Sequence, residues 1–212
     1  MNTVANNLTP ESNYVVQPKK FALWMLILGM VMFFAAFTSG YIVRKAEGNW
    51  DVFPLPMQFM YSVFIVILSS ITMQWSYWAA KRDELGQVKI GLLITLVLGI
   101  VFCGVQLWGW EELTNNGFRW TGMNNPTQEY IDKYGVTFVG SQNPASTFIY
   151  VISGAHILHV LGGIIFLVVM VVQSFKLNIH KKNLLKLSMC NTYWHFVGVL
   201  WIYLYLFLFL NR

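Results

Sequence analysis

The chain has 212 residues, of which 56% are hydrophobic and 17% aromatic, while only 11% are charged. Soluble domains usually carry about 25% charged residues, so the composition excludes a soluble protein with polar surface on all sides. It also excludes a disordered chain, which would be poor in apolar residues. Cys103 and Cys190 lie too far apart in sequence to indicate a disulfide scaffold or a thiolate metal knuckle.

Five uncharged apolar runs follow one another along the chain, at about 21–43, 57–80, 90–110, 146–172 and 188–210. None of the 14 basic or 9 acidic residues falls inside them. At about 1.5 Å per residue, each run is long enough to cross a bilayer core of roughly 30 Å as a helix. We therefore expect an all-α, polytopic membrane bundle of five transmembrane helices. A polar tail, 1–20, precedes this single domain, 21–212, whose longest loop is 111–145.

Lysine and arginine are unequally distributed between the two ends of the expected bundle. The end formed by the tail and the linkers 81–89 and 174–187 holds nine of them, and the opposite end holds five. The positive-inside rule then predicts a cytoplasmic N-terminus and a periplasmic C-terminus. The basic stretches serve as topology signals, so we expect no nucleic-acid partner. A second interpretation is that Lys181, Lys182 and Lys186 pair with anionic lipid headgroups.

Histidines are the main polar candidates inside the spans, since hydrocarbon penalises polar groups. His156 and His159 are three residues apart, on one face of the fourth span, and His195 lies in the fifth. One face of one helix cannot supply both axial ligands of a haem, and the spans offer no close thiolate pair for copper. The residues therefore favour hydrogen bonds between helices over a metal site.

Glu111 lies just beyond the third span, after Trp108 and Trp110. This grouping is typical of a membrane interface, where tryptophan lies at headgroup depth and carboxylates reach water. Glu111 remains a candidate contact for lipid or a neighbouring subunit. The spans themselves contain no acidic residue or lysine, which argues against an autonomous proton pump and for a non-catalytic membrane subunit.

Specific strings then resemble a known family. The fifth span reads YWHFVGVLW from Tyr193, and the fourth reads GAHILHVLGG from Gly154. These are similar to the YWHFVD-x-x-W and G-x-H-x-x-H-V-x-x-G patterns of subunit III of cytochrome c oxidase and its haem-copper relatives. The strings LSSIT at 68–72 and G-x-x-F at 99–102, followed by Gln106, also resemble family strings. Their order matches the five-helix form of the family, which lacks the first two helices.

Two positions depart from the family pattern. Met30 stands where the pattern S-E-V-M-x-F has a buried glutamate, and Gly198 replaces the aspartate of YWHFVD. Any role of that glutamate in proton handling therefore does not transfer to this chain.

The resemblance implies a cofactor-free subunit III of a proton-pumping terminal oxidase of the cytochrome c type, in aerobic respiration and in the bacterial cytoplasmic membrane. Subunits I and II would hold the haem and copper, and this chain would hold no metal and no catalytic residue. It would stabilise subunit I, which in many such systems carries the missing helices, and bind phospholipid. The matching polar positions are His156, His159, Trp194 and His195.

Alternatives stay open at this stage. The chain would also suit an accessory subunit of a quinol oxidase or a nitric oxide reductase, and an independent small transporter is a more distant alternative. The residues do not indicate the electron donor, the haem types or membership of a respiratory supercomplex.

Overall fold

The computed structural model describes residues 18–47, 50, 55–120, 125–135, 144–176 and 184–211. Every regular element in these ranges is a helix: α1 (Pro18–Ala46), α2 (Met57–Lys81), α3 (Leu85–Asn115), α4 (Gln128–Tyr134), α5 (Pro144–Phe175) and α6 (Leu185–Asn211). Five of them, all but α4, are long and apolar enough to cross a membrane. The prediction of an all-α bundle with five spans is confirmed.

The helices extend beyond the apolar runs. α1 already begins at Pro18, inside the stretch assigned to the tail, because proline suits the first helical position. α3 spans Leu85–Asn115, so the expected linker 81–89 shrinks to a turn, where the Arg82 amide donates to the Ala79 carbonyl. The loop 111–145 likewise starts later and contains α4, which was not predicted. Charged residues end an apolar run, but a helix continues through the headgroup region, where water solvates them.

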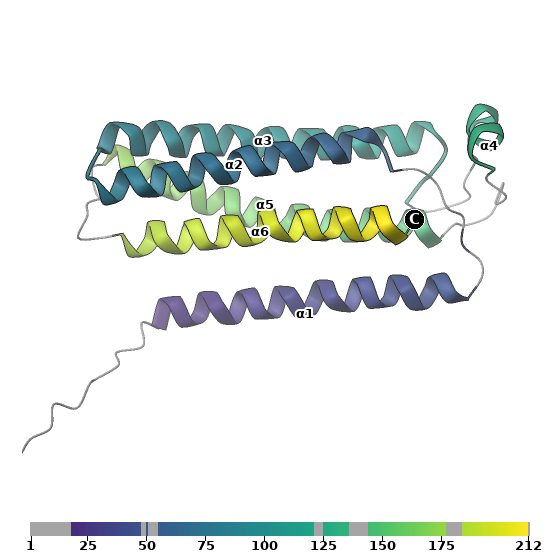
Figure 1. The fold of residues 1–212 in the computed structure, drawn as a ribbon, viewed down its shortest axis with the longest axis horizontal. Helices are drawn as coiled ribbons and strands as arrows, with labels where there is room; N and C mark the ends of the chain where they lie inside the picture. The colour runs from purple at the N-terminus through teal and green to yellow at the C-terminus, as the bar shows by residue number, and fades with distance from the viewer. Residues whose placement is uncertain are drawn as a thin grey trace, which may run out of the picture.

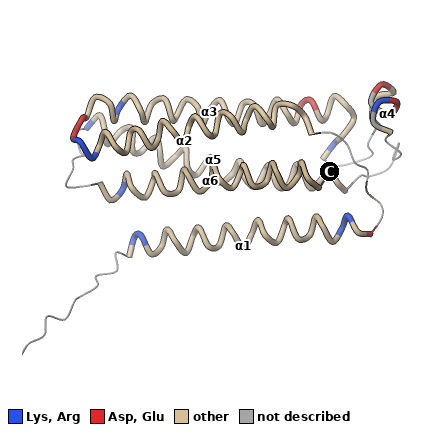
Figure 2. Tube along the Cα trace, viewed as in Figure 1, with Lys and Arg blue, Asp and Glu red and all other residues tan. Residues whose placement is uncertain are grey.

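Successive long helices run in opposite directions along the bundle (Figure 1). α2 and α3 form a hairpin that packs on α6 and α5, while α1 lies along one edge, against α5 and α6. The charged residues gather at the two ends of the long helices (Figure 2). One end contains Lys19, Lys20, Lys81, Arg82, Lys89, Lys176 and Lys186. Which end faces the cytoplasm stays a prediction.

Small residues let the helices approach closely. An added Cβ at Gly91 of α3 would lie 2.7 Å from the Ser76 Cβ of α2. Nearby, the Thr72 and Thr95 hydroxyls lie 2.9 Å apart and bridge the same two helices. In lipid, helix association depends on such close packing and on interhelical hydrogen bonds, because burial from water adds little.

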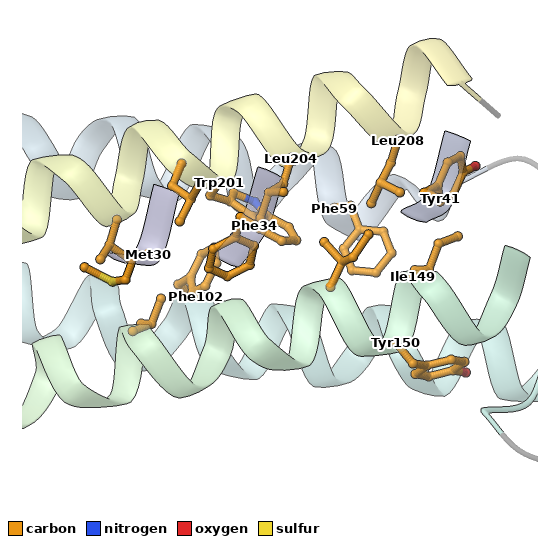
Figure 3. Close-up of a cluster of buried hydrophobic side chains, with 14 of the residues drawn as sticks. Met30, Phe34, Tyr41, Phe59, Phe102, Ile149, Tyr150, Trp201, Leu204 and Leu208 are labelled. Atoms are coloured by element: carbon orange, nitrogen blue, oxygen red, sulfur yellow. The ribbon is translucent and has the colours of Figure 1, made fainter. Parts of the chain in front are cut away.

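Aromatic side chains fill the centre of the bundle. Phe34 of α1, Phe102 of α3 and Trp201 of α6 are each at most 2% exposed. They lie together in Figure 3, with Met30 of α1 on one side of them and Tyr41 of α1 on the other. This cluster surrounds His156, one of the polar side chains that the sequence singled out.

Candidate functional site

His156 of α5 is completely buried in this aromatic centre. Its ring centroid lies 4.9 Å from that of Trp201, and its Nε2 lies 3.0 Å from the Val197 carbonyl of α6. A carbonyl only accepts, so Nε2 carries a proton and donates it to this bond. Its Nδ1 has no hydrogen-bond partner within the described ranges. His156 thus joins α5 to α6 by one hydrogen bond and by ring packing.

His159 lies on the same side of α5 but makes different contacts. Its Nδ1 donates to the Ala155 carbonyl of its own helix over 2.7 Å. Its ring centroid lies 5.5 Å from that of Phe34, while the His156 ring lies 6.4 Å from the same phenyl ring. The two histidines therefore share a face toward α1, as their spacing predicted. Within the described part of the chain, no three His, Cys, Asp or Glu side chains form a group that could hold a metal ion.

Two tryptophans of α6 donate to two serines of α2. Trp194 Nε1 donates to Ser69 Oγ, and Trp201 Nε1 donates to Ser62 Oγ, each over 2.8 Å. The tryptophans are seven residues apart, and so are the serines. Two turns of antiparallel helix thus repeat the same contact, which we call the Trp–Ser ladder.

Ser62 Oγ makes more hydrogen bonds than Ser69 Oγ does. Ser62 Oγ also accepts from Gln106 Nε2 of α3 over 2.8 Å and donates to the Phe59 carbonyl over 2.7 Å.

The sequence predicted Trp194 as a candidate contact, whereas Trp201 and Ser69 appeared only within family-like strings and Ser62 was not named. Both tryptophans lie in the YWHFV-x-x-x-W string, so the sequence could have indicated Trp201 as well. It could not indicate that the partners of the two tryptophans lie on α2.

Trp194 fills space that two glycines leave open. An added Cβ at Gly99 of α3 would lie 2.8 Å from Trp194 Cη2. One at Gly163 of α5 would lie 3.1 Å from Trp194 Cζ3. The indole therefore contacts α3 and α5 while it donates to α2, which makes it the point where four helices meet.

His195 belongs to a second group of polar side chains, on the outer side of α2 and α6. Its Nε2 donates to Gln74 Oε1 over 3.1 Å, and Asn191 Nδ2 donates to the same oxygen over 3.2 Å. All three residues are half-buried. We call Gln74, Asn191 and His195 the polar cluster; it borders a groove of about 410 Å³ between α2 and α6.

The two positions that depart from the family pattern are both packed. Met30 is 3% exposed and lies in the core cluster of Figure 3. An added Cβ at Gly198 would lie 3.0 Å from Val66 Cγ1 and 3.3 Å from Ser70 Oγ of α2. Glycine at 198 therefore lets α2 and α6 approach, and a Cβ at this position would require the Val66 and Ser70 side chains to shift by a few tenths of an ångström.

The charged candidates lie at the ends of the bundle. Glu111 is exposed near the end of α3, and Lys186 is exposed in the first turn of α6. Lys181 and Lys182 lie outside the described residues. The structure adds a candidate that sequence reasoning did not single out, a groove of about 490 Å³ between α1, α5 and α6, lined by Lys19 and Tyr193 among others.

The comparisons with known proteins point in one direction. The model of the family "Cytochrome c oxidase subunit III" matches residues 123–211, which include α5 and α6. The chain is 24% identical over 203 residues to cytochrome c oxidase subunit 3 of Bacillus sp. (strain PS3), covering 92% of this chain and 88% of the relative. These matches support the resemblance of the chain to the cytochrome c oxidase subunit III family. The relatives include the probable quinol oxidase subunit 3 of Staphylococcus aureus (strain USA300), 23% identical over 88% of this chain and 85% of the relative.

The similarity to subunit III gives the buried contacts a context. The histidine and tryptophan strings that resemble the family are the same strings that join α5 to α6 and α6 to α2. In this chain they hold helices together, since their ring nitrogens bind a carbonyl, a hydroxyl or an amide oxygen.

Proposed function

We propose that the chain is the cofactor-free subunit III of a bacterial respiratory oxidase and stabilises the subunit that carries the redox centres. Its similarity to subunit III of haem-copper oxidases supports this assignment, and its five long apolar helices indicate a multi-pass membrane protein. The observation that carries the proposal is the similarity to an oxidase subunit 3 over 92% of the chain. The use of ring nitrogens for helix contacts, rather than for a shared ligand set, supports a structural role.

Proton pumping and oxygen reduction belong, in this proposal, to the partner subunits I and II. The positions where the family pattern has acids hold Met30 and Gly198, and both are packed against neighbouring helices. The electron donor is either cytochrome c or a quinol, since relatives of both kinds match the chain.

The decisive experiment is purification of the native complex in mild detergent, followed by its visible spectrum and identification of its chains. We expect this chain to co-purify with haem-bearing subunits, and oxidation assays with reduced cytochrome c and with a quinol then identify the donor. A chain that purifies without haem-bearing partners would contradict the proposal and favour a transporter.

The stabilising role has its own measurement. A complex depleted of this subunit should keep its haem bands and its initial rate of oxygen consumption, then lose activity faster during turnover. Immediate loss of the haem bands would show that the chain bears a cofactor. Unchanged activity over many turnovers would show that it does not stabilise the core.

Phospholipid binding is the second part of the proposal. The groove between α1, α5 and α6 is apolar over most of its length and has Lys19 at its end, which suits an acyl chain and a phosphate. Lipid mass spectrometry of the mildly extracted complex should find retained phospholipid, and less of it after Lys19→Gln. Equal retention of phospholipid by the wild type and by Lys19→Gln would show that the lipid does not bind at Lys19.

We further propose that the lysine-rich end faces the cytoplasm. Gln87 and Asn115 are exposed at opposite ends of α3, so each can be replaced by cysteine. An impermeant thiol reagent added to intact cells should label Asn115→Cys and spare Gln87→Cys. The native Cys103 and Cys190 lie within spans and give little background. Labelling of Gln87→Cys alone would reverse the orientation.

A further inference from the structure

The groove between α2 and α6 runs along the outer side of the bundle. Its lining residues on α2 include Ser70, Gln74 and Trp78, which are four residues apart and so follow one stripe of that helix. On α6 they include His195 and Val199, again four residues apart. Two parallel stripes of this kind form the seat into which the ridge of another helix packs.

Small residues form the floor of the groove. Gly198 of α6 contributes no side chain, and Ser70 opposite it contributes a small one. Small residues at a membrane interface let a neighbouring backbone approach closely. The rims are apolar and exposed: Val199 is 64% exposed and Trp78 is 54% exposed.

The polar cluster has hydrogen-bonding capacity left over. Gln74 Oε1 accepts from both His195 Nε2 and Asn191 Nδ2. Within the described part of the chain, the Gln74 amide nitrogen still has protons without a recorded acceptor, and the His195 Nδ1 lone pair has no recorded donor. Asn191 Oδ1 is buried, and none of the described residues pairs with it. Gln74 and His195 line the groove, so an occupant that both donates and accepts would satisfy their free atoms.

Depth excludes a lipid headgroup as that occupant. α2 has 25 residues, so it is about 37 Å long at 1.5 Å per residue, longer than a hydrocarbon core of roughly 30 Å. Gln74 lies two turns before Lys81, or about 10 Å along the helix, and His195 lies deeper still from its own end. Headgroups stay at the interface, and acyl chains neither donate nor accept at this depth.

We propose that this groove seats a transmembrane helix of a neighbouring oxidase subunit, with a side chain at this depth that accepts from Gln74 Nε2 and donates to His195 Nδ1. The neighbour's residue at this point is a hydroxyl or an amide, since these side chains both donate and accept. The inference rests on the proposed function in one respect: the chain works as one subunit of an oxidase complex.

The test blocks the groove without touching the polar cluster. Val199→Trp fills the groove from an exposed position, and Leu158→Trp, at a position 70% exposed on α5, is the matched control. We expect Val199→Trp to lower co-purification with the haem-bearing subunits at least tenfold, and Leu158→Trp to leave it at the wild-type level. Membrane abundance and helical circular dichroism of the two variant chains should equal those of the wild type.

A photo-crosslinking amino acid at position 199 of the native complex then identifies the neighbour. We expect a crosslink to a membrane-spanning peptide of another subunit. Normal co-purification of Val199→Trp, equal loss with Leu158→Trp, or crosslinks only to lipid or to a second copy of this chain would each overturn the inference. Failure of the wild-type chain to co-purify with haem would instead overturn the proposed function, so the two failures are distinguishable.

Discussion

α6 and α1 are both long apolar helices, but they are held in the bundle in different ways. α6 is joined to α2 by the Trp–Ser ladder and to α5 by the hydrogen bond of His156, all in the middle of the span. α1 contributes mainly aromatic packing there, with Phe34 against the rings of His156 and His159.

The recorded polar contacts of α1 with other helices lie in its second half. Tyr41 and Lys45 both donate to the Asn211 carbonyl of α6, over 3.3 and 2.5 Å. At the opposite end, near Lys19, a groove separates α1 from α5 and α6. The interior helices are therefore held together at mid-membrane by hydrogen bonds and by close packing at glycines. The edge helix has its recorded hydrogen bonds to other helices in its second half and borders a groove near Lys19.

The largest effect is expected at the interior contact between Gly99 and Trp194. Gly99→Ala places a Cβ 2.8 Å from the indole, and overpacking of this kind costs about 1–3 kcal/mol. The free energy of unfolding in mixed detergent and SDS micelles, followed by tryptophan fluorescence, measures it. Gly104→Ala is the matched control on the same helix, because an added Cβ there meets nothing within 4 Å. Equal effects of the two substitutions would remove the distinction between close-packed and open glycines.

A somewhat smaller effect is expected from Ser62→Ala. This change leaves two buried donors, Trp201 Nε1 and Gln106 Nε2, without the oxygen that they share. Interhelical hydrogen bonds in membranes are worth about 0.6–2 kcal/mol each, so we expect a loss of about 1–2 kcal/mol in the same assay. Ser174→Ala is the control, since Ser174 donates within its own helix to the Val171 carbonyl. A stability equal to that of the control would mean that the ladder is packing alone.

The smallest effect is expected at the edge helix. Tyr41→Phe removes one hydrogen bond to the Asn211 carbonyl, and Lys45 still donates to that carbonyl. We expect a loss of about 0.5 kcal/mol and faster amide hydrogen exchange confined to the second half of α1. Exchange that also rises in α2 and α3 would show that α1 is coupled to the interior as strongly as α6 is.

The sequence predicted the membrane spans, because charged residues are excluded from them. The five spans followed from runs without Asp, Glu, Lys or Arg, and the shared face of His156 and His159 followed from their spacing. The predicted helices were too short. Lys89, for example, lies just before an apolar run but inside α3, which begins at Leu85. Polarity marks the hydrocarbon boundary, whereas the helix ends where its backbone is capped.

The contacts themselves could not be predicted, because they depend on register between distant helices. Ser62 and Trp201 are 139 residues apart in sequence, and the sequence around one gives no indication that the other is its hydrogen-bond partner. Gly198 was interpreted only as a lost acid, although the structure shows it as the close approach of α6 to α2. The groove at Lys19 could not be located from the sequence, because residues of α1, α5 and α6, which are distant in sequence, line it together.

The placement of α1 has a consequence for biosynthesis. Among the helices, its partners are α5 and α6, which the ribosome makes only after α2, α3 and α4. α1 therefore enters the bilayer and waits there without its partners, and the bonds from Tyr41 and Lys45 form only once Asn211 has been inserted. A chain interrupted before α5 would leave α1 without its helix partners. Packing of α1 on α5 and α6 therefore requires that the whole bundle has been inserted.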